Sequence, residues 1–242
     1  MTLHDTYLAL QNVLGNQIEP FESIELIDEY RQYFKPAQVK VLLLAESHVF
    51  TSDEDTSIRI PPISGLKGYP TKYAKFVYCL AYGERSLTKS KSHPKRDGTP
   101  QFWKIFYSCS NKIQNQEDFS PILGRTPTLE RINNKASILL SLKENGIWLV
   151  DTSIAALYKD GKKLKNMQEA LSVSWQSYTK EVVLNAEPQH VICIGKGVAR
   201  EVEMDLKKHF NKKYSVVAQP NAFLSSKEHM ANYIHYSRVC CG

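Results

Sequence analysis

Polar side chains that could do chemistry follow three apolar runs, at the point where each run ends. In chain order they are Glu46-Ser47-His48 after residues 41–45, Asp151 after residues 147–150, and Gln219-Pro220-Asn221 after residues 214–218. An unbroken apolar run that ends in polar residues is typical of a buried parallel strand. Because ligands of open α/β sheets bind where such strands end, we expect these segments to form the walls of one pocket.

Glu46 is the strongest catalytic candidate in this set. A carboxylate directly after a buried strand must lose water or find a partner. It would serve as a general base or as an electrostatic stabiliser of a positively charged transition state, and His48 is close enough to share that role. The alternatives are that Glu46 caps the following turn and that His48 faces the loop.

Asp151 and the segment after residue 218 each have two interpretations. An ionised aspartate accepts hydrogen bonds and donates none, which suits recognition of a donor. Followed by Thr152 and Ser153, Asp151 also suits the N-cap of a helix. Pro220 and Asn221 are compatible with an ordinary turn as well as with a binding loop.

Two further segments carry groups suited to phosphate. Gly195-Lys196-Gly197 is too short for a nucleotide-binding loop, but Lys196 and the N–H groups of a helix start could hold one phosphate. Residues 84–100 are basic and rich in helix breakers, and they include Lys95 and Arg96. This stretch is either a solvated loop or an arm that contacts phosphates.

The elements that must position these residues alternate along the chain. Apolar runs predict strands at 39–45, 147–150, 190–194 and 214–218. Helical spacing or composition predicts helices at 5–15, 22–34, 73–82, from 101, and at 128–144, 167–186, 198–210 and 226–238, with a long irregular stretch over 46–70. The alternation predicts an α/β fold, a three-layer αβα sandwich with a central, mainly parallel four-stranded sheet. Without an internal repeat or linker, we expect residues 1–242 to form a single domain.

Composition narrows the function classes only a little. The 242 residues carry a net charge of +6, which is compatible with a nucleic-acid partner and with an ordinary soluble enzyme. The five cysteines form no CxxC pair, so we expect reduced thiols in a cytoplasmic protein, without a metal site or a cofactor. We find neither a signal peptide nor an apolar run long enough to span a membrane.

Together, the three strand ends resemble the motifs of the uracil-DNA glycosylase superfamily. That family has a first motif like G-E-x-P-G, a middle motif like G-[VI]-x-L-[LV]-N, and a last motif of the form H-P-S-x-L-S or N-P-S-x-L-S. The corresponding residues here are 43–49, 146–152 and 217–225, in the family's order. The departures are Ala45 for Gly, His48-Val49 for Pro-Gly, Asp151 for Asn, Gln219 for His or Asn, and Asn221 for Ser, and the iron–sulfur cysteines of some members are absent.

The resemblance implies a monofunctional DNA glycosylase that flips a nucleotide out of duplex DNA and hydrolyses its N-glycosidic bond, leaving an abasic site. Glu46 would orient the water and stabilise the cationic sugar, and the Gln219 amide would donate to O2 of the leaving base. The other implied contacts are Phe50 or Tyr69 stacked on the base, Asn221 beside it, Phe223 or Leu224 as the wedge, and Ser225, Lys196, Lys95 and Arg96 on the DNA. We expect a monomer that binds double-stranded DNA and no membrane.

Asp151 is the most informative departure from the family pattern. A carboxylate would repel O4 of uracil but would accept from an exocyclic amine such as N4 of cytosine. Since excision of ordinary cytosine would destroy the cell's own genome, we expect a C5-modified cytosine, glycosylated forms included, with residues 51–68 around the modification. Bulky C5-substituted cytosines occur in phage DNA, so a role in antiviral defence is a further hypothesis.

Three alternatives stay open at this point. The protein is a plain uracil-DNA glycosylase of base-excision repair, a catalytically inactive relative that binds DNA or a protein, or a nucleotide-binding α/β protein. The last rests only on Gly195-Lys196-Gly197.

Overall fold

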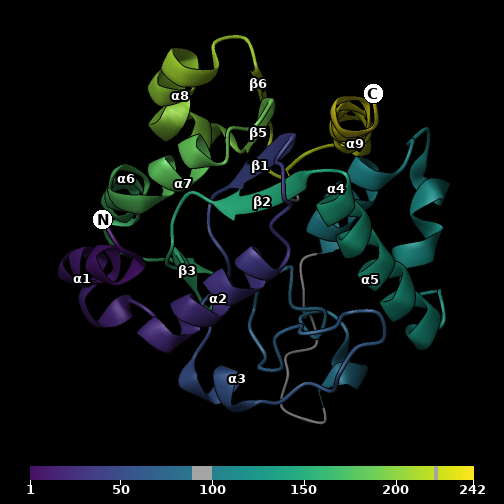
Figure 1. Ribbon diagram of the computed structural model, residues 1–242, viewed down its shortest axis with the longest axis horizontal. Coiled ribbons are helices and arrows are strands. Elements are labelled where there is room, and N and C mark those ends of the chain that lie inside the picture. The colour runs from purple at the N-terminus through teal and green to yellow at the C-terminus, as the bar shows by residue number, and fades with distance from the viewer. Residues whose placement is uncertain (89–99, 221–222) are drawn as a thin grey trace.

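A parallel sheet of four strands forms the centre of the protein. The computed structural model describes residues 1–88, 100–220 and 223–242. The strands are β1 (Val41–Ala45), β2 (Ile147–Asp151), β5 (His190–Ile194) and β6 (Tyr214–Val217), in the order β2-β1-β5-β6. Every neighbouring pair is parallel, and helices flank the sheet, so the predicted three-layer αβα sandwich is confirmed (Figure 1).

Most of the expected helices are present. The helices are α1 (Leu3–Leu14), α2 (Phe21–Tyr33), α3 (Asp53–Ser57), α4 (Pro100–Ser110), α5 (Thr128–Glu144), α6 (Met167–Ser174), α7 (Lys180–Asn185), α8 (Lys196–Phe210) and α9 (Ser226–Cys241). A π-helical stretch, Trp175–Thr179, joins α6 to α7, so the helix predicted over 167–186 runs nearly without interruption.

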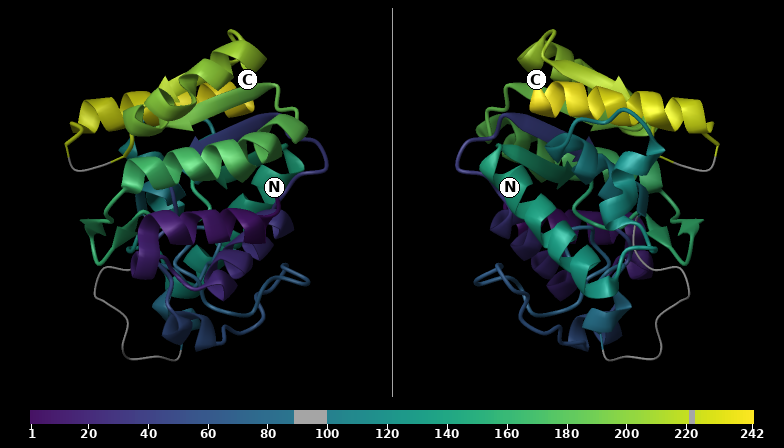
Figure 2. Two further views of the ribbon diagram at one scale, coloured as in Figure 1. Left: turned by 90° about the vertical axis from the view of Figure 1, so that its left-hand side faces the viewer. Right: turned by 90° about the vertical axis from the view of Figure 1, so that its right-hand side faces the viewer.

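Alternate residues of the strands bury opposite faces of the sheet. Leu43 and Leu149 point into a core with α2, α4, α5 and α9, whereas Leu42 and Trp148 point into a second core with α7 and α8. Figures 1 and 2 show α8 and α9 on opposite faces of the sheet. Since strands with two buried faces need apolar residues at every position, this packing explains the unbroken apolar runs.

The prediction of a helix over residues 73–82 is wrong. This segment is irregular, although most of it is buried. Short backbone turns and one tyrosine hydroxyl take the place of the helical hydrogen bonds. The hydroxyl of Tyr69 donates to the carbonyl oxygen of Tyr78 (2.8 Å) and accepts from the N–H of Leu80 (2.7 Å). The Tyr78 hydroxyl in turn accepts from the N–H of Leu149 in β2 (2.8 Å). Buried backbone groups need such partners, and apolar composition alone did not reveal these.

A small hairpin follows β2. Its strands are β3 (Tyr158–Lys159) and β4 (Lys162–Lys163), and they pair antiparallel. Asp160 and Gly161 between them both have positive φ, of 52° and 75°. Two such residues in succession form the type I′ turn for which Asp-Gly is a preferred sequence.

Candidate active site at the carboxyl ends of the strands

The ends of β1 and β2 lie side by side, as the motifs predict. Ala45 pairs with Asp151 across the two strands. Beyond that pair, the N–H and the hydroxyl of Thr152 both donate to the Ala45 carbonyl oxygen, at 2.8 and 2.7 Å. The N–H of Ser153 donates to the Glu46 carbonyl oxygen at 3.0 Å. The parallel register therefore brings Glu46 and Asp151 to neighbouring positions at one edge of the sheet.

The turn between β5 and α8 lies between Glu46 and Gln219. A Cβ placed on Gly197 would stand 3.8 Å from Oε1 of Glu46, and one placed on Gly195 would stand 3.8 Å from Oε1 of Gln219. Gly195 has a φ of +110°, a conformation that side chains rarely adopt. Lys196, the exposed first residue of α8, completes this turn.

Glu46 is half-buried, and its surroundings act on its protonation in opposite directions. Burial raises the pKa of the Glu46 carboxyl, while a hydrogen bond with the Tyr158 side chain and the charge of Lys163 lower it, with a net rise. Tyr158 and Lys163 belong to the β3–β4 hairpin. The hairpin therefore covers the carboxyl that the motifs single out.

A small pocket lies at the ends of β1 and β2; Ser47 and His48 line it, but Glu46 is not among its lining residues. Its walls include His48, Phe76, Tyr82, Leu149 and Asp151. Its volume is about 40 Å³.

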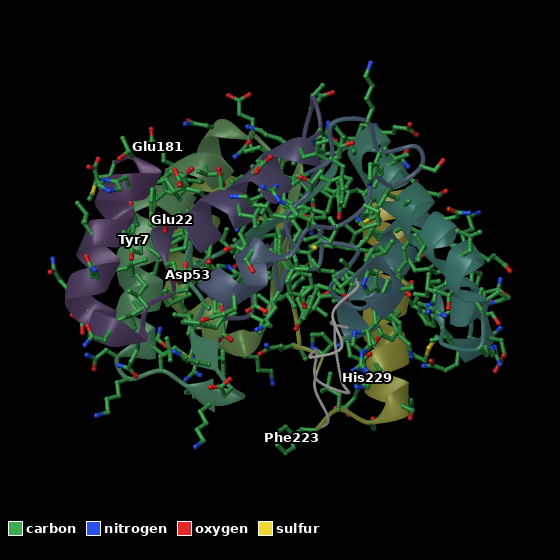
Figure 3. The ribbon with its side chains drawn as sticks, turned by 90° about the horizontal axis from the view of Figure 1, so that it is seen from below. Tyr7, Glu22, Asp53, Glu181, Phe223 and His229 are labelled. Carbon is green, nitrogen blue, oxygen red and sulfur yellow. The ribbon has the colours of Figure 1, made fainter. Side chains whose placement is uncertain are left out.

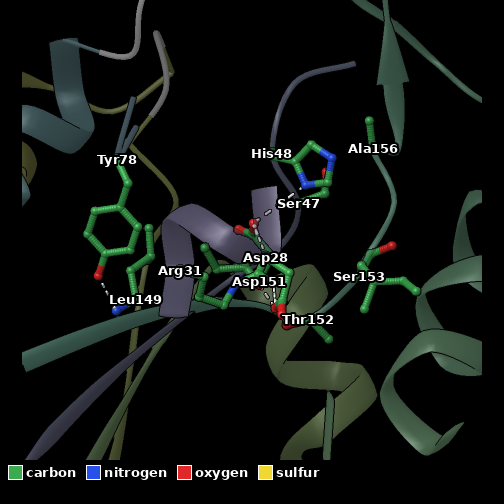
Figure 4. Close-up of polar contacts among 12 residues, drawn as sticks. Asp28, Arg31, Ser47, His48, Tyr78, Leu149, Asp151, Thr152, Ser153 and Ala156 are labelled. Carbon is green, nitrogen blue, oxygen red and sulfur yellow. Dashed lines mark hydrogen bonds and ion pairs between the residues drawn. The ribbon is translucent and has the colours of Figure 1, made fainter. Parts of the chain in front are cut away.

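Asp151 is buried at one wall of this pocket and is paired with Arg31. Its Oδ2 lies 3.2 Å from Nη2 of Arg31, whose Nη1 lies 2.9 Å from Oδ1 of Asp28 (Figure 4). Arg31 lies in the last turn of α2, where a helix favours a cation, and its carbonyl oxygen accepts from the indole N–H of Trp148. The N-cap interpretation of Asp151 is wrong, because it is the last residue of β2 and no helix follows directly.

His48 is fully buried between two carboxylates, so the interpretation that it faces the loop is wrong. Its Nε2 lies 2.6 Å from Oε1 of Glu19, and its Nδ1 lies 3.6 Å from Oδ2 of Asp151. Burial opposes the charged imidazolium, but the charge of Glu19 and the contacts with both carboxylates raise the pKa of His48 to about 9. The ring is therefore a cation at neutral pH.

Glu19 is a site residue that the sequence reasoning missed. Besides His48, its carboxylate accepts from the N–H of Ala156 (2.7 Å) and from the N–H of Thr51 (3.0 Å). These partners come from two different segments, one after β1 and one after β2, and His48 is 29 residues away in sequence. Neither a motif nor a local periodicity could have indicated this contact.

The expected stacking residues lie apart from the pocket. Phe50 lines a different hollow beside Tyr7, and its ring lies under the ammonium group of Lys159 at 4.2 Å. Tyr69 is buried in the core, with both of its hydroxyl bonds made to residues 78 and 80. Phe76 lines the pocket instead, with its ring centroid 6.3 Å from that of His48.

The last motif is only partly described. Phe223 is 93% exposed at the outer end of the segment that leads into α9 (Figure 3), and Leu224 is half-buried. Ser225 is the N-cap of α9, since its hydroxyl accepts from the N–H of Glu228. Three further predicted contacts, Lys95, Arg96 and Asn221, lie outside the described residues.

Comparison of the sequence with protein-family models and with curated proteins finds no match. The resemblance to uracil-DNA glycosylases therefore rests on the three motifs and stays a prediction. Among the described residues, no group of three or more His, Cys, Asp or Glu side chains is arranged to hold a metal ion. The same residues include no helix with the length and apolarity needed to cross a bilayer.

Proposed function

We propose that the protein is a monofunctional DNA glycosylase that removes an altered pyrimidine, a C5-modified cytosine, from DNA. The observation that carries this proposal is the placement of a half-buried carboxyl, Glu46, and a buried hydrogen-bond acceptor, Asp151, at the ends of two paired strands. Asp151 lines a pocket with an aromatic wall. Two carboxylates in different surroundings are suited to different roles, one in the reaction and one in recognition.

In the proposed reaction, Glu46 acts on water and on the sugar. The C1′–N1 bond breaks with its electron pair going to the base, so C1′ gains positive charge that the Glu46 carboxylate stabilises. Water then forms a bond to C1′, and its proton passes to Glu46. The base leaves as an anion and is protonated by solvent, while the Gln219 amide donates a hydrogen bond to its O2. Partial burial supports this role, because charges interact more strongly away from bulk water.

Base recognition is assigned to Asp151 and Phe76. The Asp151 carboxylate accepts from the exocyclic amine, and the ring of Phe76 offers a stacking surface. Phe76 and Tyr82, which line the pocket, lie on the irregular segment 73–82, which is not part of a helix or of the sheet.

A single-turnover assay tests the proposal. Duplexes that contain uracil, a thymine mismatch, cytosine, 5-hydroxymethylcytosine or glucosylated 5-hydroxymethylcytosine are incubated with excess protein, and released bases are identified by mass spectrometry. We expect release of a C5-modified cytosine, its loss in Glu46→Gln, and retained DNA binding by that variant. Preference for uracil would overturn the assignment of Asp151 and favour a plain repair enzyme.

A second candidate function is that of a catalytically inactive relative that binds DNA. It is favoured by the position of Glu46, the expected catalytic carboxyl, which is not among the residues that line the pocket. Absence of base release from every duplex, with DNA binding intact in the wild type, would establish this function and exclude the first. The suggested role in defence depends on the first function and on release of a phage-type base.

A further inference from the structure

His48 has one ring nitrogen that is fixed and one that is not. Nε2 bonds to Glu19, but Nδ1 is buried and has no hydrogen-bond partner among the described residues. Oδ2 of Asp151 stands 3.6 Å from it, which is longer than a hydrogen bond. Buried polar atoms nearly always have partners, so an orphaned one in a pocket wall indicates a ligand atom that is missing.

Glu19 determines which kind of atom Nδ1 is. Its carboxylate accepts three hydrogen bonds, from His48, Thr51 and Ala156, which fixes its orientation. Next to this anion the imidazole holds two protons, one on each nitrogen. Nδ1 therefore carries a charged N–H donor in the pocket wall, 3.6 Å from Oδ2 of Asp151.

The donor of His48 lies beside the acceptor of Asp151, so a matching ligand edge has an acceptor opposite His48 and a donor opposite Asp151. The proposed function has Asp151 at the exocyclic C4 substituent, and the present inference rests on that placement. The next atom along the ring is N3, which is an acceptor in cytosine and an N–H donor in uracil. In this orientation cytosine satisfies both residues, whereas uracil opposes both.

We propose that His48 is a base-reading residue that donates from Nδ1 to N3 of a cytosine-type base, and that Glu19 is the positioning residue that keeps this donor in place. In this role His48 takes no part in the hydrolytic step. Recognition of the base is divided between the ends of two adjacent strands, with the acceptor on β2 and the donor after β1.

Binding of free bases tests this inference separately from catalysis. The probes are 5-hydroxymethylcytosine and its 3-deaza analogue, in which a C–H group replaces the N3 acceptor, titrated into the full chain and followed by NMR at pH 7.5. We expect the wild type to bind the parent base at least about tenfold more tightly than the analogue, the equivalent of about 1.4 kcal/mol.

Variants distinguish positioning from a general structural role. In Glu19→Gln the imidazole loses its anionic partner, so the discrimination between base and analogue should fall below about threefold, while the affinity for the analogue stays the same. The matched control is Glu22→Gln, the same substitution at an exposed position of α2, which should keep the full discrimination. A variant that lost affinity for both probes equally would show that Glu19 only maintains the fold.

The outcomes separate the two proposals. Equal binding of base and analogue by a wild type that releases modified cytosine from DNA overturns the role of His48 and leaves the glycosylase intact. Discrimination without any base release supports the recognition role and overturns the catalytic proposal. Binding of uracil in preference to both probes overturns the inference.

Discussion

Replacing Arg31 by methionine is expected to destabilise the protein by about 3–5 kcal/mol, the range found when one partner of a buried ion pair is removed. The side chains of Arg31 and Asp151 are only 4% and 2% exposed, so water cannot replace the lost guanidinium at the Asp151 carboxylate. Asp28, the second partner of Arg31, is 18% exposed and is more readily hydrated. Most of the destabilisation should therefore come from Asp151.

A double substitution tests that reasoning. In Arg31→Met with Asp151→Leu, the unpaired carboxylate is gone, and apolar replacement of a whole buried pair is often close to neutral. We expect the double variant to be more stable than Arg31→Met alone, measured as the free energy of unfolding in urea. The control is Arg125→Met, which breaks a pair whose side chains are 56% and 78% exposed and should change stability by about 0–1 kcal/mol. A loss below about 1 kcal/mol for Arg31→Met, or additive losses in the double variant, would refute the reasoning.

Three more predictions follow from the site. The pKa of His48 is raised from 6.5 to about 9, so the protonated ring stabilises the fold fully below pH 6.5, and this stabilisation is lost as the pH rises through 9. The free energy of unfolding in urea should fall by roughly 3 kcal/mol across this range. In Glu19→Gln most of this pH dependence should disappear. Tyr158→Phe removes a hydrogen bond that lowers the pKa of Glu46, so the acidic limb of the single-turnover pH profile should move to higher pH, and an unmoved limb would contradict the contact. Phe223→Ala should weaken the binding of duplex DNA. Because the side chain is 93% exposed, the melting temperature of the protein should stay unchanged.

The sheet could be predicted from the sequence because its signals are local. Each strand is a continuous apolar run, and the flanking helices have apolar residues at helical spacing. The order of strands and helices then leaves few topologies, and the observed register places Glu46 beside Asp151 as the parallel arrangement requires. The segment at 73–82 misled the prediction because its burial depends on tyrosine hydroxyls from elsewhere in the chain, which composition does not show.

The chemistry around the pocket could not be predicted in the same way. Arg31 and Asp151 are 120 residues apart in sequence, and Glu19 and His48 are 29 apart. A pairing of this kind is set by how α2 packs on the sheet, and no spacing rule describes it. The aromatic wall of the pocket could not be predicted either. Phe76 lines the pocket in place of the expected Phe50 or Tyr69. The path of an irregular segment decides which ring faces inward, and no local pattern describes that path.

The arrangement of buried charges also bears on why the site exists. Glu19, His48, Asp151, Arg31 and Asp28 form a chain of alternating sign, with three carboxylates and two cations. Apolar residues would fill this volume with equal or greater stability, since desolvation of buried ions offsets their attraction. The excess of one negative charge favours a cationic sugar near the carboxyl ends of the strands, while the imidazolium faces the pocket in which the base would lie. Under the proposed function, this negative charge would stabilise the sugar that becomes positive as its bond to the base breaks.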